Sequence, residues 1–374
     1  MDFEFNDQQL LIRDTFRRFL DGRAPEASAQ PVHFDSEYWR QLADLGLFAL
    51  LVPERFGGHG LKLIDVALVI EELGRALTNA LVSETLMATD LIVRYGNDTQ
   101  RSALLPRVAA GRLRVTSAVL EPDSGFGTSR LATQAKEAHN GSLLEGVKIL
   151  VPEAANADLV MVATRTGDAD NLALMLLEPG RRGIGLREQV TLDPSSRLSE
   201  LTLSAVELAP EDWLGGLSLP AGGIDRLLDL ASTSAALQMM GIAGKVLELS
   251  TTHATDRIQF GKPIGAFQAI KHKCADMAVA IEAGRAAAYF AAWALSEAPA
   301  QAGKAVSIAK SFAGDTVSMV CNEGTQIHGG MGFTWELGLH FYLRRAKLLE
   351  YSAGDSTHHR ERVLRETLAE LGLS

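Results

Sequence analysis

The chain has 374 residues, of which 47% are apolar and 22% are charged, so it is long enough for two or three globular domains with a large buried core. The formal net charge is −10, from 36 basic and 46 acidic residues, which argues against a protein that binds nucleic acid or an anionic membrane. No run of about 18 apolar residues is present and the N-terminus is acidic, so neither a membrane span nor a signal peptide is expected.

The first hundred residues have helical patterns. Asn6 is a typical N-cap for the amphipathic run that follows it. Gly111 closes this section. Further helices are predicted over residues 38–47, 64–77, 86–95 and 100–110.

From residue 114 the hydrophobic period changes to short apolar runs separated by turn residues, which predicts a small antiparallel β domain. The predicted strands are residues 143–151, 158–163, 172–178 and 201–208. Long, alanine-rich helices that are apolar all round then predict a buried bundle. They cover residues 224–256, 267–296, 303–329 and 337–351, with a short helix after His358. We therefore predict a mainly α-helical fold in three domains, over residues 1–113, 114–215 and 216–374.

The two cysteines show no metal-binding spacing. Cys274 and Cys321 lie in helical patterns among apolar neighbours, so we expect buried free thiols in a reducing compartment, the cytoplasm. His358 and His359 are adjacent and cannot share one helical face. No metal site is predicted.

The most informative stretch begins at Arg257, where a long helical pattern stops and another starts near Phe267. Arg257, Lys262 and the free amides of the new helix could together hold an anion, with Gln259, Phe260 and Gln268 beside it. The alternative is a plain interhelical turn with a solvated arginine. The residues alone leave both interpretations open.

This stretch resembles the signature Arg-x-x-Phe-Gly-x-x-Ile-x-x-x-Gln of the acyl-CoA dehydrogenase family. A later segment, Gln326-Ile-His-Gly-Gly-Met-Gly-Phe-Thr-Trp-Glu336, resembles a second family block, and the helix–strand–helix order matches the family fold. The resemblance implies an FAD that is held by the neighbouring subunit's residues, across an interface in a dimer or tetramer. The implied FAD contacts are Arg257, Gln259, Phe260, Phe267, Gln268, Gln326, Gly329 and Gly330. His328 is expected to be structural.

The chain departs from the family where the chemistry takes place. The family removes the α-proton of an acyl-CoA thioester with a Glu, and hydride passes to the flavin. Ala353 occupies the position of that Glu, and Ala231 occupies an alternative Glu position used by some members, after Leu228-Asp229-Leu230. The arginine that usually follows this Glu and helps to hold the CoA is replaced by Ser232. The residues expected to line the flavin have changed too, to Leu120, Phe126, Leu150 and Pro152.

Three hypotheses follow from these departures. The chain is a base-less subunit of a heteromeric acyl-CoA dehydrogenase, in which it completes the FAD site of a second, related subunit. It is instead a catalytic homo-oligomer, dehydrogenase or oxidase, with a displaced base such as Asp355 or Asp229. Or it is a structural oligomer without flavin. The family resemblance implies an acyl-CoA substrate and electron-transfer flavoprotein as the acceptor for the first hypothesis.

Overall fold

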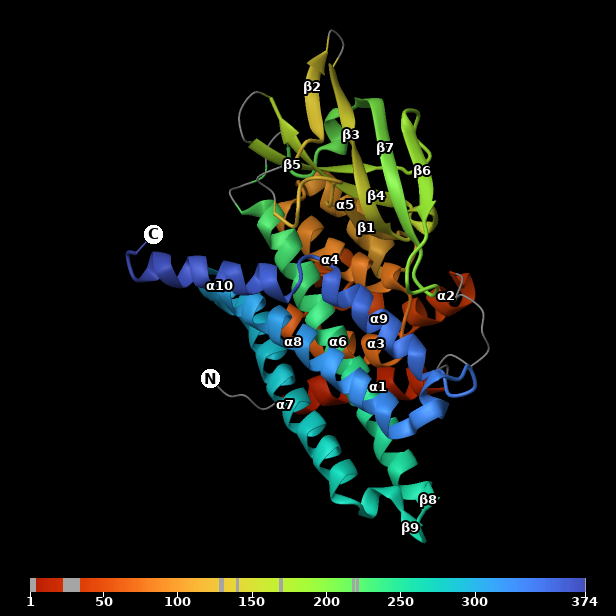
Figure 1. Ribbon diagram of the computed structural model, residues 1–374. Coiled ribbons are helices and arrows are strands. Elements are labelled where there is room, and N and C mark those ends of the chain that lie inside the picture. The colour runs from red at the N-terminus through yellow and green to blue at the C-terminus, as the bar shows by residue number, and fades with distance from the viewer. Residues whose placement is uncertain are drawn as a thin grey trace. The chain divides into compact units, whose positions relative to one another are not determined.

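The computed structural model describes residues 5–22, 34–127, 131–138, 141–167, 171–216, 219 and 222–373 (Figure 1). Contacts between residues divide the chain into two compact units. The first unit combines Met1–Gln30, Lys62–Thr78 and Ala231–Ser374, and the second combines Pro31–Leu61 and Asn79–Leu230. Both units therefore draw on the N-terminal helices, and the long helix α6 (Gly223–Asp256) begins in the second and continues in the first. The boundaries of the three predicted domains stay a prediction.

The first unit is helical. Its first helix begins at the predicted cap, because the Asn6 side chain accepts the backbone N–H of Gln9 while the Gln9 side chain accepts the backbone N–H of Asn6. The long C-terminal helices predicted from the sequence are confirmed, and α7 and α8 lie side by side (Figure 1). The helices of this unit besides α6 are α1 (Asp7–Asp21), α3 (Leu63–Arg75), α7 (Gln268–Glu297), α8 (Pro299–His328), α9 (Leu339–Tyr351) and α10 (Ser356–Glu370).

Two glycines let α3 and α6 approach closely within the first unit. A Cβ on Gly74 would lie 2.2 Å from the backbone oxygen of Gln238, and a Cβ on Gly241 would lie 1.9 Å from the backbone oxygen of Glu71. Both distances are far below van der Waals contact. The two helix backbones can meet at this separation only because neither glycine has a side chain.

Ion pairs connect α1 and α7 to α3. Glu71 and Glu72 are buried on this helix, where an unpaired carboxylate would be costly. Glu72 pairs with Arg17 of α1, at 2.5 Å. Glu71 pairs with Arg285 of α7, at 2.8 Å, and accepts the hydroxyl of Tyr289. These pairs satisfy both buried acids and join α1, α3 and α7.

The second unit contains a seven-stranded sheet with the order β1-β4-β2-β3-β7-β6, in which β5 pairs with β4. Apolar runs predicted β3, β4, β5 and β7, whereas β1, β2 and β6 were not predicted. The strands are β1 (Val115–Ala118), β2 (Gln134–Ala138), β3 (Gly141–Pro152), β4 (Leu159–Thr166), β5 (Asn171–Leu177), β6 (Ile184–Gln189) and β7 (Leu198–Leu208).

The predicted antiparallel sheet is wrong in part, because the sheet is mixed. Strand β4 runs parallel to β1 and to β2. The other pairs of this sheet, β2–β3, β3–β7, β4–β5 and β6–β7, are antiparallel. The chain passes through the whole β2–β3 hairpin between β1 and β4. A connection of this length lets two strands align in the same direction, which a tight turn cannot do.

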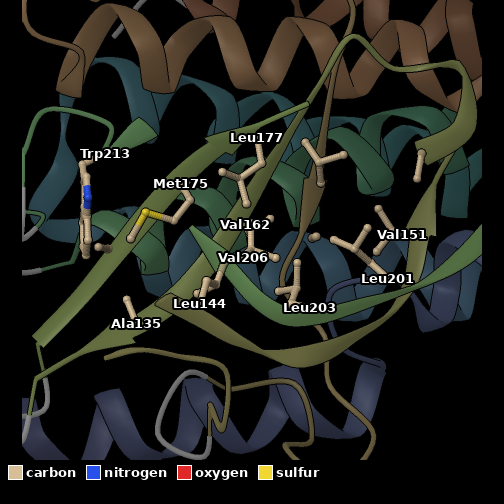
Figure 2. Packing of buried hydrophobic residues seen from close by; sticks show 14 residues of the cluster. Ala135, Leu144, Val151, Val162, Met175, Leu177, Leu201, Leu203, Val206 and Trp213 are labelled. Carbon is tan, nitrogen blue, oxygen red and sulfur yellow. The ribbon is translucent and has the colours of Figure 1, made fainter. Parts of the chain in front are cut away.

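One apolar cluster holds the strands of the second unit together (Figure 2). Val162 and Met175 from β4 and β5 are fully buried with Leu201 and Val206 from β7. Trp213 closes the cluster beside β5, and its backbone forms a bridge to Met175. Burial of this surface is the main stabilising contribution to the sheet.

Helix α4 covers one edge of this sheet. Among the described strands β1 pairs only with β4, so the backbone groups on its other edge need partners outside the sheet. The hydroxyl of Thr85 on α4 donates to the Val115 carbonyl at 3.1 Å and accepts the Val115 N–H at 3.0 Å. The helices of this unit besides the start of α6 are α2 (Ser36–Asp44), α4 (Ala80–Tyr95) and α5 (Asp98–Ala109). None of the helices found in either unit has the length and apolarity needed to cross a membrane, within the described ranges.

Candidate functional site

The stretch from Arg257 to Gln268 forms a short hairpin between α6 and α7. Strands β8 (Ile258–Gln259) and β9 (Lys262–Pro263) pair antiparallel, where the sequence predicted only a turn. The two residues between the strands, Phe260 and Gly261, have φ angles of +53° and +78°. Such a turn matches the twist of a two-stranded ribbon. In Figure 1 the hairpin stands at the end of α6 and α7.

The predicted FAD contacts on this hairpin are open to solvent. Phe260 is 93% exposed, and Arg257, Gln259 and Gln268 are exposed as well. Arg257 forms no side-chain hydrogen bond or ion pair with any described residue. Phe267 is partly buried, with the ring of Phe260 edge-on at 6.1 Å and the Lys262 ammonium 4.3 Å from its centroid. An exposed arginine and an almost fully exposed phenylalanine on one hairpin indicate a surface that binds a ligand or partner.

Helix α7 has a free N-terminus beside the hairpin. Its N-cap is Phe267, which makes no side-chain capping hydrogen bond. The first amides of a helix have no partner within the helix, and the helix dipole places partial positive charge there. With the guanidinium of Arg257 nearby in the chain, these amides are suited to an anionic group such as a phosphate.

The second predicted block follows α8. Gln326 is exposed in its last turn, and Gly329 has a φ angle of +60° at its end. Gly329 and Gly330 are exposed, and a Cβ on either would meet nothing within 4 Å. The backbone of this glycine turn is therefore open to close approach by a ligand.

Two histidines bring these segments together. His328 is buried near the end of α8, and its Nδ1 lies 2.8 Å from the Gly324 carbonyl, to which it donates. Its ring stacks on that of His253 with the centroids 4.5 Å apart. His253 lies in the last turn of α6, four residues before Arg257. The stacked pair thus places the starts of the hairpin and of the glycine turn side by side, in agreement with the structural role expected for His328.

The turn between α9 and α10 carries no acid at position 353. Ala353 has a φ angle of +53°, and its carbonyl accepts from His359 Nε2 at 3.1 Å and from the Ser232 hydroxyl at 3.4 Å. The buried Lys310 ammonium donates to the carbonyls of Glu350, at 2.8 Å, and Gly354, at 2.7 Å. Side chains from α6, α8 and α10 therefore hold the backbone of this turn in place, although the side chain at position 353 is only the methyl group of alanine.

Burial changes the titration of the groups that hold this turn. Burial lowers the pKa of Lys310 to about 7. Burial also lowers the pKa of His359 to about 3, so this imidazole stays neutral in the folded protein and can donate from Nε2 to the Ala353 carbonyl while Nδ1 accepts from the Ser307 hydroxyl. The available signal for Lys310 in the sequence is a lysine flanked by apolar and small residues in an alanine-rich helical segment.

The alternative acids are engaged elsewhere. The Asp355 carboxylate accepts the backbone N–H of His358 at 2.8 Å and is the N-cap of α10. Asp229 is buried on the part of α6 that belongs to the second unit and also has an interaction partner. Capping and burial therefore already give both carboxylates a structural role.

Strand β3 offers little to a flavin ring. The Leu150 N–H donates to the Gln189 side-chain oxygen at 2.7 Å, and Pro152 has no N–H to give. The Leu120 carbonyl accepts the Ile149 N–H at 2.9 Å, and the Pro152 carbonyl accepts the Thr116 hydroxyl at 2.6 Å. The backbone donors at positions 150 and 152 are thus either used or missing. The exposed hairpin of the first unit has groups that could bind the phosphates of a dinucleotide. Strand β3 of the second unit lacks free backbone donors for a flavin ring.

A buried ion pair in the second unit was not predicted. Lys148 on β3 is fully buried and lies 2.6 Å from the carboxylate of Glu121, which also accepts the Thr133 N–H at 3.0 Å. Burial lowers the pKa of Lys148 to about 8. The pair anchors the segment that begins with Leu120 to the sheet. A lysine within an apolar strand pattern was the signal available in the sequence.

The succession of helices, a mixed sheet and long helices, with an exposed hairpin between two of them, is the architecture of flavin-dependent acyl-CoA oxidoreductases. Family models for the N-terminal and C-terminal domains of acyl-CoA dehydrogenases match residues 6–112 and 224–368. The benzylmalonyl-CoA dehydrogenase of Aromatoleum aromaticum is 30% identical over 371 residues, covering 95% of this chain and 97% of that protein. The chain belongs to the acyl-CoA dehydrogenase family.

Solved structures confirm the fold. The butyryl-CoA dehydrogenase of Megasphaera elsdenii superposes with a TM-score of 0.90 at 26% identity, covering 98% of this chain and all of that one (100%). A chain of the ChsE4-ChsE5 complex of Mycobacterium tuberculosis superposes with a TM-score of 0.88 at 25% identity, covering 99% of each chain. The predicted family and fold class are therefore confirmed, and family membership supports FAD as the cofactor. The individual FAD contacts stay predictions.

Proposed function

We propose that this chain is the non-catalytic subunit of a heteromeric acyl-CoA dehydrogenase and that it completes the FAD site of a second, related subunit. The complex dehydrogenates an acyl-CoA thioester between its α and β carbons. Electron-transfer flavoprotein accepts the electrons, and the complex works in the cytoplasm.

Ala353 is the observation that carries this proposal. A methyl group cannot take a proton, and the neighbouring Asp355 is committed to capping α10. Ala231, at the alternative base position, is no acid either, and Ser232 beside it binds the Ala353 carbonyl. The residues that should remove the substrate's α-proton are therefore absent from both positions at which the family resemblance places a base.

The exposed hairpin supports the second half of the proposal. Arg257, Phe260 and Gln268 point away from the chain's own core and have the chemistry to bind a phosphate and an adjacent ring. FAD, when bound, supplies the hydride acceptor. The residues of this chain bind and orient it through Arg257, the free amides of α7 and the glycine turn at Gly329.

A related assembly supports a heteromer. The ChsE4-ChsE5 structure is a complex of two different proteins, and one of its chains matches this chain over nearly its full length. Strand β3 also supports this proposal. The Leu150 N–H is already bonded to Gln189 and Pro152 has no N–H, so neither position can donate a backbone hydrogen bond to a flavin ring. A chain that contributes to a flavin site in its partner can lose its own site without losing the hairpin.

The test is co-expression with a candidate partner, a related acyl-CoA dehydrogenase subunit from the same organism that retains the catalytic Glu. The expected result is a yellow complex that contains one FAD for every two chains, while this chain purified alone is colourless. The stoichiometry is measured from the flavin absorbance and the protein concentration of the complex.

Two outcomes would contradict the proposal. If the chain alone binds FAD and an acyl-CoA bleaches the flavin, the chain is an autonomous enzyme with a displaced base. If the complex forms but is colourless, the chain is a structural oligomer component. Addition of free FAD during purification controls for loss of a weakly bound cofactor.

A further inference from the structure

The end of helix α6 and the hairpin that follows it have little burial of their own (Figure 1). Among residues 251–263, only Ala254 is buried and only His253 is partly buried, whereas the other residues are exposed. The backbone passes directly from this last turn of α6 into the hairpin. The position of the hairpin therefore depends on what holds the last turn of α6 in place.

The stack of His253 on His328 is the contact that joins this last turn to α8. The ring centroids lie 4.5 Å apart, with an angle of 28° between the ring planes. The other side-chain hydrogen bonds of residues 251–263 among described residues stay within α6 or the hairpin, and they come from Thr251, Thr255 and Gln259. A contact between two titratable rings thus holds the base of the hairpin.

The surroundings of the two rings disfavour a proton on the stack. His328 is buried with its Nδ1–H bonded to Gly324, and its Nε2 has no partner among described residues, so a proton added there would lack an acceptor. His253 is partly exposed and can take a proton from solvent. Burial lowers the pKa of His253 from its ordinary value of 6.5, and the charges of His328 and Arg257 lower it further.

Two other charged groups near the stack do not reverse this effect. Asp256 raises the pKa of His253, but the combined effect of burial, His328 and Arg257 is larger. Lys273 of α7 is paired with Glu323 of α8, five residues before His328. The stack is therefore most stable when both rings are neutral.

We propose that His253 and His328 form an acid-sensitive latch, which holds the hairpin in position while both rings are neutral and releases it when His253 is protonated. His253 is a positioning residue, because it acts on the hairpin through the end of α6. Its pKa is lower in the latched chain than in the released chain, so the latch weakens as the pH falls below 6.5. The latch is a property of this chain alone, and only its consequence for FAD, weaker binding in acid, rests on the proposed function.

The test measures hydrogen exchange of the full-length chain at pH 7.5 and pH 6.0, with protection factors corrected for the intrinsic effect of pH. The reporting amides are the Arg257 N–H, bonded to the His253 carbonyl at 2.9 Å, and the Ile264 N–H, bonded to the Arg257 carbonyl at 2.8 Å. A released imidazole with the ordinary pKa favours release by at most about fourfold at pH 6.0. We expect protection to fall by about two- to fourfold, while the buried residues 232–243 of the same helix keep theirs.

The variant H253F separates the latch from a general effect of pH. Phenylalanine can stack on His328 but cannot be protonated, so H253F should be equally protected at both pH values. H253A removes the stack and should be less protected than H253F already at pH 7.5. H272F, at an exposed histidine of α7, should lose protection in acid as the unmodified chain does.

Either of two results would overturn the proposal. One is hairpin protection in the unmodified chain that does not change between the two pH values, and the other is an equal fall in H253F. The measurement uses neither a partner subunit nor FAD, so its failure is distinguishable from failure of the proposed function.

Discussion

The backbone at position 353 is strained, and the residues around it show how the strain is maintained. Ala353 has a left-handed φ angle of +53°, which costs an L-amino acid roughly 1–2 kcal/mol. His359 and Ser232 bind its carbonyl, and Lys310 binds the carbonyls on either side of it. These contacts come from residues far apart in the sequence. The sequence could therefore show that the acid is missing, but not that the turn is still tightly held.

Replacement of Ala353 by glycine should stabilise the chain. Glycine adopts a positive φ angle without steric penalty, so A353G should raise the free energy of unfolding by about 1 kcal/mol. Urea denaturation of the isolated chain measures this. The control is A283G on the exposed surface of α7, where glycine should lower stability by about 1 kcal/mol. Equal destabilisation by both variants would show that position 353 is not strained in solution.

Lys310 should make stability depend on pH. Its pKa is about 7 in the folded chain, against an ordinary value of 10.5. Between these values the unfolded chain binds a proton at Lys310 that the folded chain lacks, so this residue's contribution to the free energy of unfolding rises from pH 7 toward pH 10. The comparison of unmodified chain and K310M at pH 7 and pH 9.5 isolates this contribution.

The difference in stability between the unmodified chain and K310M should therefore grow in favour of the unmodified chain as the pH rises. Burial lowers the pKa of Lys148 as well, to about 8, so that residue contributes in an overlapping range. K148M removes this second contribution. The pH-dependent difference in stability caused by K310M should therefore also be seen when K310M is introduced into the K148M variant. A difference that is independent of pH would mean that Lys310 stays protonated in the folded chain.

At the scale of elements, the helices could be predicted far better than the strands. The N-cap Asn6 correctly marked the start of α1, and the long apolar pattern located α6 within a few residues. Strands β2 and β6 were missed because their sequences, QAKEA and IGLREQ, are largely polar, and β6 is mostly exposed. The β8–β9 hairpin was missed because each strand has two residues. Pairing with neighbours, rather than local pattern, creates these strands.

The contact between α3 and α6 depends on a missing side chain. In G241A the new Cβ would lie 1.9 Å from the Glu71 backbone oxygen, so the two helices must separate. We expect a loss of about 2–3 kcal/mol in the free energy of unfolding, the usual cost of overpacking a core. Chemical denaturation measures it. G180A is the control, because a Cβ there meets nothing within 4 Å, and it should change stability by less than about 0.5 kcal/mol.

At the scale of the whole molecule, the features of function are unequally distributed. The first unit keeps an exposed arginine and aromatic hairpin, while its turn at Ala353 has lost the acid. The second unit has a β3 strand whose donors are used or missing, and the first unit also carries the stacked His253–His328 pair. The sequence could predict the first three of these from motifs. It could not predict the last, because the pairing of His253 with His328 depends on how the end of α6 packs against the end of α8.

Substitution of Arg257 tests whether the hairpin binds the FAD of a partner subunit and contributes nothing to the stability of its own chain. Because Arg257 is exposed and has no ion pair or side-chain hydrogen bond among described residues, R257A should leave the thermal unfolding of the isolated chain unchanged. In the complex with a catalytic subunit, the same variant should weaken FAD binding about tenfold or more, since it removes a charge-assisted contact to the cofactor. Flavin retained after dialysis measures this effect. R365A, an exposed arginine on α10, should retain the flavin. If R257A retains the flavin equally well, the hairpin does not reach the partner's cofactor, and the role that the family resemblance implies for Arg257 does not operate in this complex.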